Sequence, residues 1–185
     1  MRLIKKGFSM NMLTRVVMTV VAAATAVLAT GCQQTVRGWK GDLVITPDAS
    51  LRDSSGKMPP VEVDVVAINE TDEMVRSYPV DNWFSGEDKQ RASCAPYTKS
   101  LAFGPGAEGA VVISKSDPIW KKWEERGYKD LVVFATARSM KASPGGFDGR
   151  RKVIPLTNDK WDVGQINFEV KSSGVECPTP MKLQK

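Results

Sequence analysis

The side chains available for chemistry are mainly cysteines and carboxylates, because the 185-residue chain contains three cysteines and no histidine. The lack of histidine excludes Ser-His and Cys-His nucleophile systems, His-ligated zinc sites and the commonest general base. The 21 acidic residues offer many carboxylate pairs for glycoside cleavage, but no pair stands out, and no EF-hand-type calcium loop occurs. We therefore expect a protein that is not an enzyme and that uses no metal or other cofactor.

Cys32 lies at the end of a segment typical of exported proteins. Basic residues without any acidic residue precede an apolar run from Val16 to Ala29, which is shorter than the roughly 20 residues that span a bilayer as a helix. The run leads into Thr30-Gly31-Cys32. This junction resembles the lipobox of bacterial lipoprotein precursors, whose cysteine thiol is acylated before cleavage, although Leu28 stands one position earlier than usual. We predict a lipoprotein signal peptide over residues 1–31 and lipidation of Cys32; a plain secretory signal is the alternative, and Met10 or Met12 is an alternative start.

The net charge depends on this signal peptide. The whole chain has 26 basic and 21 acidic residues, but residues 1–31 hold four of the basic residues and none of the acidic ones. The remainder is therefore nearly neutral, and no segment of it interleaves a Lys/Arg cluster with aromatic residues. We exclude nucleic acid as a partner and expect a membrane, contacted through the N-terminal lipid, and a protein of the cell envelope.

Cys94 and Cys177 are the two cysteines that remain besides Cys32. In an oxidising compartment such a pair commonly forms a disulfide. The bridge would close a loop of roughly 80 residues and contribute about 4 kcal/mol in the chain-entropy model. We predict this disulfide; two free thiols are the alternative.

The chain after the signal peptide has the pattern of one β-rich domain. Residues 32–38 are predicted to be a lipidated tether, and residues 39–185 have the length of a single domain with its own core. Apolar runs, several with alternating polar residues and separated by Gly/Pro turns, predict an antiparallel β-sandwich with one short helix. The expected strands are 39–45, 61–68, 97–103, 110–114, 131–137, 151–156 and 164–170.

Two glycine-bearing segments help to define these elements. Residues 104–109 spell G-x-G-x-x-G, but a strand-like apolar run follows instead of a helix, so we predict a hairpin turn and not a phosphate-binding loop. The clearest helix signal lies in residues 116–127, where Asp117 caps, Pro118 opens and Gly127 ends a helix. The same helix carries Trp120 and Trp123, which we expect to be core residues; a sugar-binding platform is the alternative. A helical turn within residues 78–86 is predicted to bury Val80, Trp83 and Phe84.

Together these features resemble the outer-membrane lipoproteins of type VI secretion systems. The likeness covers residues 43–170 and rests on short matches: Thr46-Pro47-Asp48, Pro59-Pro60-Val61-Glu62-Val63, Trp83-Phe84, Leu101-x-x-Gly104-Pro105-Gly106 and the strands 65–68, 131–137 and 150–156. The loop 143–149, the Trp120/Trp123 helix and the cysteine pair depart from the pattern.

The resemblance implies a β-sandwich that anchors an envelope complex and binds an inner-membrane component through an exposed loop. The position most similar to that loop is 69–77, which makes Asn69, Glu70, Asp72 and Glu73 candidate partner-binding residues; a solvated polar loop is the alternative. Gln33 follows Cys32 where enteric bacteria place Asp to retain a lipoprotein in the inner membrane, so we expect the periplasmic face of the outer membrane. The competing function is a carbohydrate- or cell-wall-binding module that uses exposed tryptophans.

Overall fold

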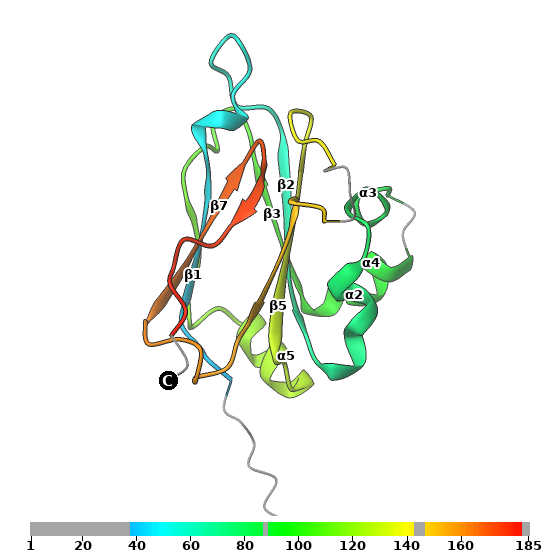
Figure 1. Ribbon diagram of the computed structural model, residues 1–185, viewed down its shortest axis with the longest axis vertical. Coiled ribbons are helices and arrows are strands. Elements are labelled where there is room, and N and C mark those ends of the chain that lie inside the picture. Colours follow the sequence, from blue (N-terminus) through cyan, green and yellow to red (C-terminus); the bar gives the residue numbers. More distant parts are fainter. Residues whose placement is uncertain (1–37, 87–88, 143–146, 183–185) are drawn as a thin grey trace, which may run out of the picture. The chain divides into compact units, whose positions relative to one another are not determined.

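The computed structural model describes residues 38–86, 89–142 and 147–182 (Figure 1). Every described residue belongs to one compact unit, residues 36–185. The predicted signal peptide, Cys32 and nearly all of the tether lie outside the described residues.

In the described residues, eight strands form two four-stranded sheets, with the orders β4-β1-β7-β8 and β3-β2-β5-β6. Buried residues alternate with less buried ones along β1 and β7; in β7 the buried residues are Ile166, Phe168 and Val170. This confirms the predicted β-sandwich. The strands are β1 (Asp42–Pro47), β2 (Val61–Ile68), β3 (Thr98–Phe103), β4 (Val111–Ile113), β5 (Asp130–Ala137), β6 (Arg151–Pro155), β7 (Gln165–Lys171) and β8 (Gly174–Glu176).

Two details of the strand pairing differ from the prediction. The pair β1–β7 is parallel, with Asp42 opposite Gln165, so the sandwich is not wholly antiparallel. Strands β3 and β4 do not form a hairpin, because β3 pairs with β2 and β4 pairs with β1. The turn between them, in which Gly106 has a φ of 83°, carries the chain from one sheet to the other. Phe103 and Ile113 can then both pack in the core between the sheets.

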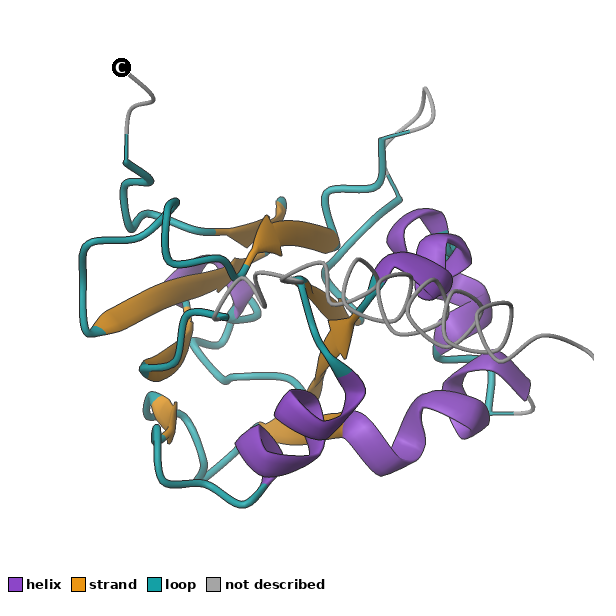
Figure 2. Ribbon diagram, turned by 90° about the horizontal axis from the view of Figure 1, so that it is seen from below, coloured by secondary structure: helices purple, strands orange, loops and turns teal. Residues whose placement is uncertain are grey.

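The helical content is larger than the single short helix that we predicted. The described residues hold four α-helices and three 3-10 segments, and α2, α3 and α4 lie against the outer side of the β3-β2-β5-β6 sheet (Figures 1 and 2). Their bounds are η1 (Ala49–Leu51), η2 (Glu70–Asp72), α2 (Glu73–Ser77), α3 (Val80–Trp83), α4 (Lys89–Cys94), η3 (Ala95–Tyr97) and α5 (Ile119–Arg126).

Helices α2, α3 and α4 cover the outer side of this sheet because its central strands, β2 and β5, are apolar on both faces. Val63 and Val65 point into the core between the sheets, whereas Val66 and Ile68 belong to a second cluster on the outer side. There Trp83 of α3 stacks on Phe134 of β5, with ring centroids 4.3 Å apart. Without α2–α4 this apolar face would be exposed to water.

Helix α5 follows the predicted signals closely. Asp117 Oδ1 accepts a hydrogen bond from the Ile119 backbone N–H at 2.9 Å, and Gly127 ends the helix in the left-handed region with a φ of 68°. Trp120 and Trp123 are both fully buried in the core between the sheets. The carbohydrate-binding alternative thereby loses the exposed tryptophan pair on which it depended.

Candidate functional site

The segment predicted to be a partner-binding loop, residues 69–77, is helical. Asn69 caps the 3-10 segment η2: its side-chain oxygen accepts a hydrogen bond from the Thr71 N–H at 2.9 Å, and its own N–H donates to Asp72 Oδ2 at 3.1 Å. This reciprocal arrangement is a capping box. The sequence pattern Asn-x-x-Asp at positions 69–72 carries that signal, so the helical start could have been predicted.

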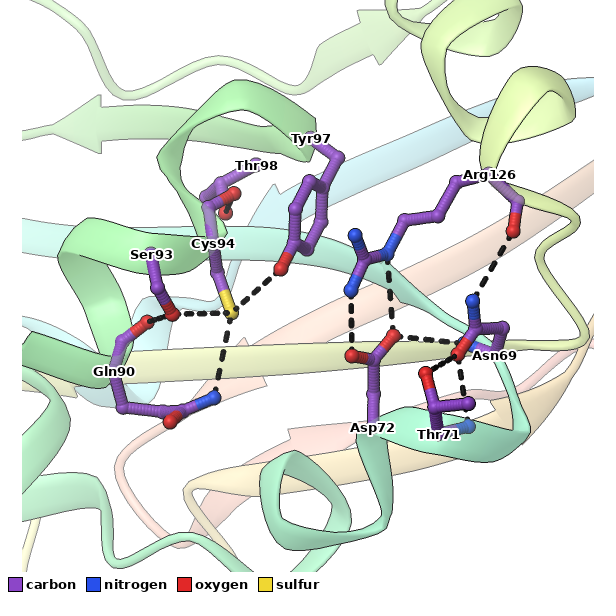
Figure 3. A network of polar contacts seen from close by, with 9 residues as sticks. All are labelled: Asn69, Thr71, Asp72, Gln90, Ser93, Cys94, Tyr97, Thr98 and Arg126. Carbon is purple, nitrogen blue, oxygen red and sulfur yellow. Dashed lines mark hydrogen bonds and ion pairs between the residues drawn. The ribbon is translucent and has the colours of Figure 1, made fainter.

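Two of the four candidate residues hold this segment in place. Asp72 forms an ion pair with Arg126 of α5, with Oδ1 2.5 Å from Nη2, and its other oxygen accepts from Nε at 3.2 Å. The amide of Asn69 donates to the backbone carbonyl of Arg126 at 3.1 Å. Both candidates therefore attach η2 to the end of α5 and do not point freely toward a partner (Figure 3).

The same network continues to Cys94. The guanidinium carbon of Arg126 lies 3.7 Å from the ring centroid of Tyr97, and the Tyr97 hydroxyl donates to the Cys94 thiol at 3.4 Å. Burial and the hydrogen bond to Cys94 raise the pKa of Tyr97 above its ordinary value, so the phenol stays protonated. The hydrogen bond and charge of Asp72 outweigh desolvation and raise the pKa of Arg126. The network links η2, α5, η3 and α4 (Figure 3), and the side chains that contact the Cys94 thiol are the neutral ones of Gln90, Ser93 and Tyr97.

The other two candidates face solvent. The side chains of Glu70 and Glu73 are 78% and 79% exposed, and next to them Met74 is 68% exposed. Glu70 contacts Lys129, whose hydrogen bond lowers the pKa of the Glu70 carboxyl, and Glu73 lies 3.0 Å from Arg76. We call Glu70, Glu73 and Met74 the acidic ridge. The acidic ridge combines two carboxylates with an exposed apolar side chain. The sequence analysis predicted the carboxylates but not the contribution of Met74.

The predicted disulfide between Cys94 and Cys177 is absent, and both thiols are free. Cys94, the last residue of α4, is buried in the outer cluster, whereas Cys177 packs against the core between the sheets. The β3-β2-β5-β6 sheet therefore separates them. An even number of cysteines in the sequence does not show on which side of a sheet each one lies.

Among residues 38–86, 89–142 and 147–182, no three Cys, Asp or Glu side chains are grouped as a metal site would require. Likewise, no described helix is long and apolar enough to cross a membrane.

Comparison with known proteins bears on the fold. No protein-family model and no curated protein sequence matches the chain. Among solved structures, a chain of a type VI membrane complex aligns with a TM-score of 0.50 and 16% identity, covering 77% of this chain and 100% of that one. The chain has the fold of a type VI membrane-complex component.

Two further structures are similar over most of the domain. The C-terminal domain of the type VI secretion protein TssM from EAEC aligns with a TM-score of 0.49 and 16% identity, covering 74% of this chain and 98% of that one. Lip from Serratia marcescens, a membrane-bound component of the type VI secretion system, aligns with a TM-score of 0.47 and 13% identity, covering 76% and 97%.

Proposed function

We propose that this chain is a membrane-anchored envelope lipoprotein that serves as a structural or accessory component of a type VI secretion-like complex. The observation that carries the proposal is the match of its sandwich to the full length of a type VI membrane-complex chain. The fold alone is consistent with several roles. The lipobox-like junction at Cys32 and the lack of histidine favour an anchored, non-catalytic one.

The anchor would keep the domain close to the lipid. Six residue steps separate Cys32 from Gly38, the first described residue, and an extended chain spans at most about 3.6 Å per residue. The domain would thus begin within roughly 20 Å of the lipidated cysteine. We place it on the periplasmic face of the outer membrane, because Gln33 follows Cys32.

Fractionation of cells that produce the Cys32→Ala variant tests the anchor. We expect the wild-type chain in the membrane fraction and the variant in the soluble periplasmic fraction. A Cys177→Ala variant is the matched control, since it removes a different cysteine, and it should fractionate like the wild type. Membrane association of Cys32→Ala at the wild-type level would contradict the proposed lipidation.

The acidic ridge is the surface that we assign to the envelope partner. Methionine adapts its shape to an apolar contact, and flanking carboxylates favour a partner that presents basic groups around an apolar residue. Each carboxylate already has one basic neighbour at an exposed position, where such pairs are worth only about 0–1 kcal/mol. A partner can therefore compete for them at little cost.

Crosslinking in native envelopes tests this assignment. We expect the wild-type chain to capture a reproducible protein partner and the Glu73→Lys/Met74→Asp variant to lose it. Glu176→Lys, which reverses an exposed charge in β8, is the control and should retain the partner. Reproducible capture by both variants would show that the partner binds a different surface. No capture by the wild type would count against the assembly role itself.

A further inference from the structure

A pocket lies at the end of the sandwich opposite the start of β1. It has a volume of about 500 Å³ and opens between the segment that joins β1 to β2, the β3–β4 turn and the end of β5. Figure 1 shows the β1–β2 segment at the end of the domain opposite the start of β1. The pocket therefore lies away from α2, which carries Glu73 and Met74 of the acidic ridge.

The inner part of the pocket is apolar and poor in hydrogen-bond donors. Leu51 and Met58 are among the lining residues, but at 0% and 2% exposure they lie beneath the accessible wall. Its other apolar lining residues are Pro59, Pro60 and Pro105, and proline has no backbone N–H. An extended peptide bound there would leave its own carbonyl groups without donors from these walls, which is costly. A hydrocarbon chain has no such requirement.

The mouth of the pocket is basic. Lys57 and Arg138 line it at exposed positions, and in the described part of the chain neither side chain forms an ion pair. The neighbouring Arg52, by contrast, is paired with Glu108 at 2.5 Å.

The acidic residue of the lining, Asp53, is held by its own loop. One of its oxygens accepts hydrogen bonds from the Ser55 N–H and hydroxyl and from the Lys57 N–H. The lining thus carries two cations and one carboxylate, an excess of one positive charge, and the carboxylate is turned toward its own loop.

We propose that this pocket binds a small amphiphile with a single anionic head, of the medium-chain carboxylate class. The carboxylate pairs with Lys57 and Arg138 at the mouth, and the hydrocarbon chain packs against the three prolines, which are the accessible apolar residues of the lining. The volume falls within the range of about 300–1,000 Å³ that is usual for small-molecule sites. The inference does not depend on the proposed assembly function.

Calorimetric titration of residues 36–185 with decanoate tests the proposal. This fragment is a compact unit that contains the whole core, and it excludes the apolar N-terminal segment, which would itself bind amphiphiles. We expect one site. Octanoate, which is two methylenes shorter, should bind about fifteenfold more weakly, and decanol should bind at least tenfold more weakly because it has no charge.

Variants at the mouth separate specific binding from surfactant-like adsorption. Lys57→Gln/Arg138→Gln should weaken decanoate binding at least tenfold, whereas Lys141→Gln, at an exposed lysine outside the pocket, should leave it unchanged. Near-ultraviolet circular dichroism identical to that of the wild type shows that the variants are folded. No binding, binding at several sites, equal binding by the double variant, or tighter binding of an acidic apolar peptide than of decanoate would each overturn the proposal.

Discussion

At the scale of single residues, the helical cover is fixed to the sheet by buried charges as well as by apolar contacts. Asp64 of β2 is 1% exposed, and one of its oxygens accepts hydrogen bonds from Trp83 Nε1 and Arg91 Nε, both at 2.8 Å. Arg150, which is 4% exposed, pairs with Asp148 and with Asp81 of α3. Each buried charge therefore has a partner from the elements that cover it, as a low-dielectric environment requires.

Replacing Asp64 by alanine should destabilise the domain strongly. The change leaves the indole N–H of Trp83 without its acceptor and deprives Arg91 of its buried partner, so we expect a loss of about 2–3 kcal/mol. Urea unfolding of residues 36–185, followed by tryptophan fluorescence, measures the loss. Glu62→Ala removes the 59% exposed partner of Arg91 and should cost about 1 kcal/mol or less. Equal losses for the two variants would refute the role of burial.

The Asp148–Arg150 pair should make stability depend on acid pH. The hydrogen bond from Arg150 lowers the pKa of Asp148 below its ordinary value of 3.8. A depressed folded-state pKa contributes stability above the unfolded-state pKa, and this stability is lost as pH falls through the folded-state pKa. The wild type should therefore be more stable than Asp148→Asn at pH 7, with the difference shrinking below about pH 4.

Unfolding curves from pH 7 to pH 2.5 measure that difference. Asp162→Asn is the control, because Asp162 is 88% exposed and its replacement should matter little at any pH. A difference between wild type and Asp148→Asn that stays constant over the whole range would show that the ion pair does not titrate as described.

The candidate site shows what sequence can and cannot reveal about single residues. The charge and polarity of residues 69–73 predicted an exposed acidic surface, and Glu70 and Glu73 form one. That Asn69 and Asp72 turn inward depends on Arg126, which is more than 50 residues away in the chain and enters the site only when α5 packs beside η2. Long-range partners of this kind leave no local pattern.

At the scale of elements, the termination of α5 is encoded by one glycine. Gly127→Ala places a side chain in the left-handed conformation, which costs about 1–2 kcal/mol for residues other than glycine. No atom lies within 4 Å of the added Cβ, so the cost comes from the backbone alone. Gly109→Ala is the control, because its Cβ also meets nothing and its φ is not positive, and stability should change by less than about 0.5 kcal/mol. Thermal unfolding compares the two.

Strands with a clear apolar run or alternation of apolar and polar residues could be predicted from the sequence, and the short helices could not. Strands β2, β5 and β7 lie where alternation or a continuous apolar run placed them. Helices α2 and α4 have five and six residues and are too short to be stable by themselves. They form because packing on the apolar outer face of β2 and β5 stabilises them, and this packing arises only in the tertiary fold.

At the scale of the whole molecule, the sheet that separates the two cysteines should control their reactivity. Iodoacetamide should label Cys177 in the native fragment 36–185 and Cys94 only after unfolding, because Cys94 is fully buried and Cys177 is not. Intact mass spectrometry reads the number of labels. Reduction before labelling should change neither result; a gain of two daltons on reduction would reveal a disulfide and contradict the free thiols.

The parallel pairing of β1 with β7 also governs when the domain can be completed. Asp42 meets Gln165, so the partner of the first strand is synthesised near the end of the chain. Such distant pairings raise contact order and slow folding. A chain that is synthesised N-terminus first will hold β1 with an open edge until Gln165–Lys171 arrives. During that interval the first strand is the segment most exposed to wrong pairing, and a holding chaperone has the most to protect there.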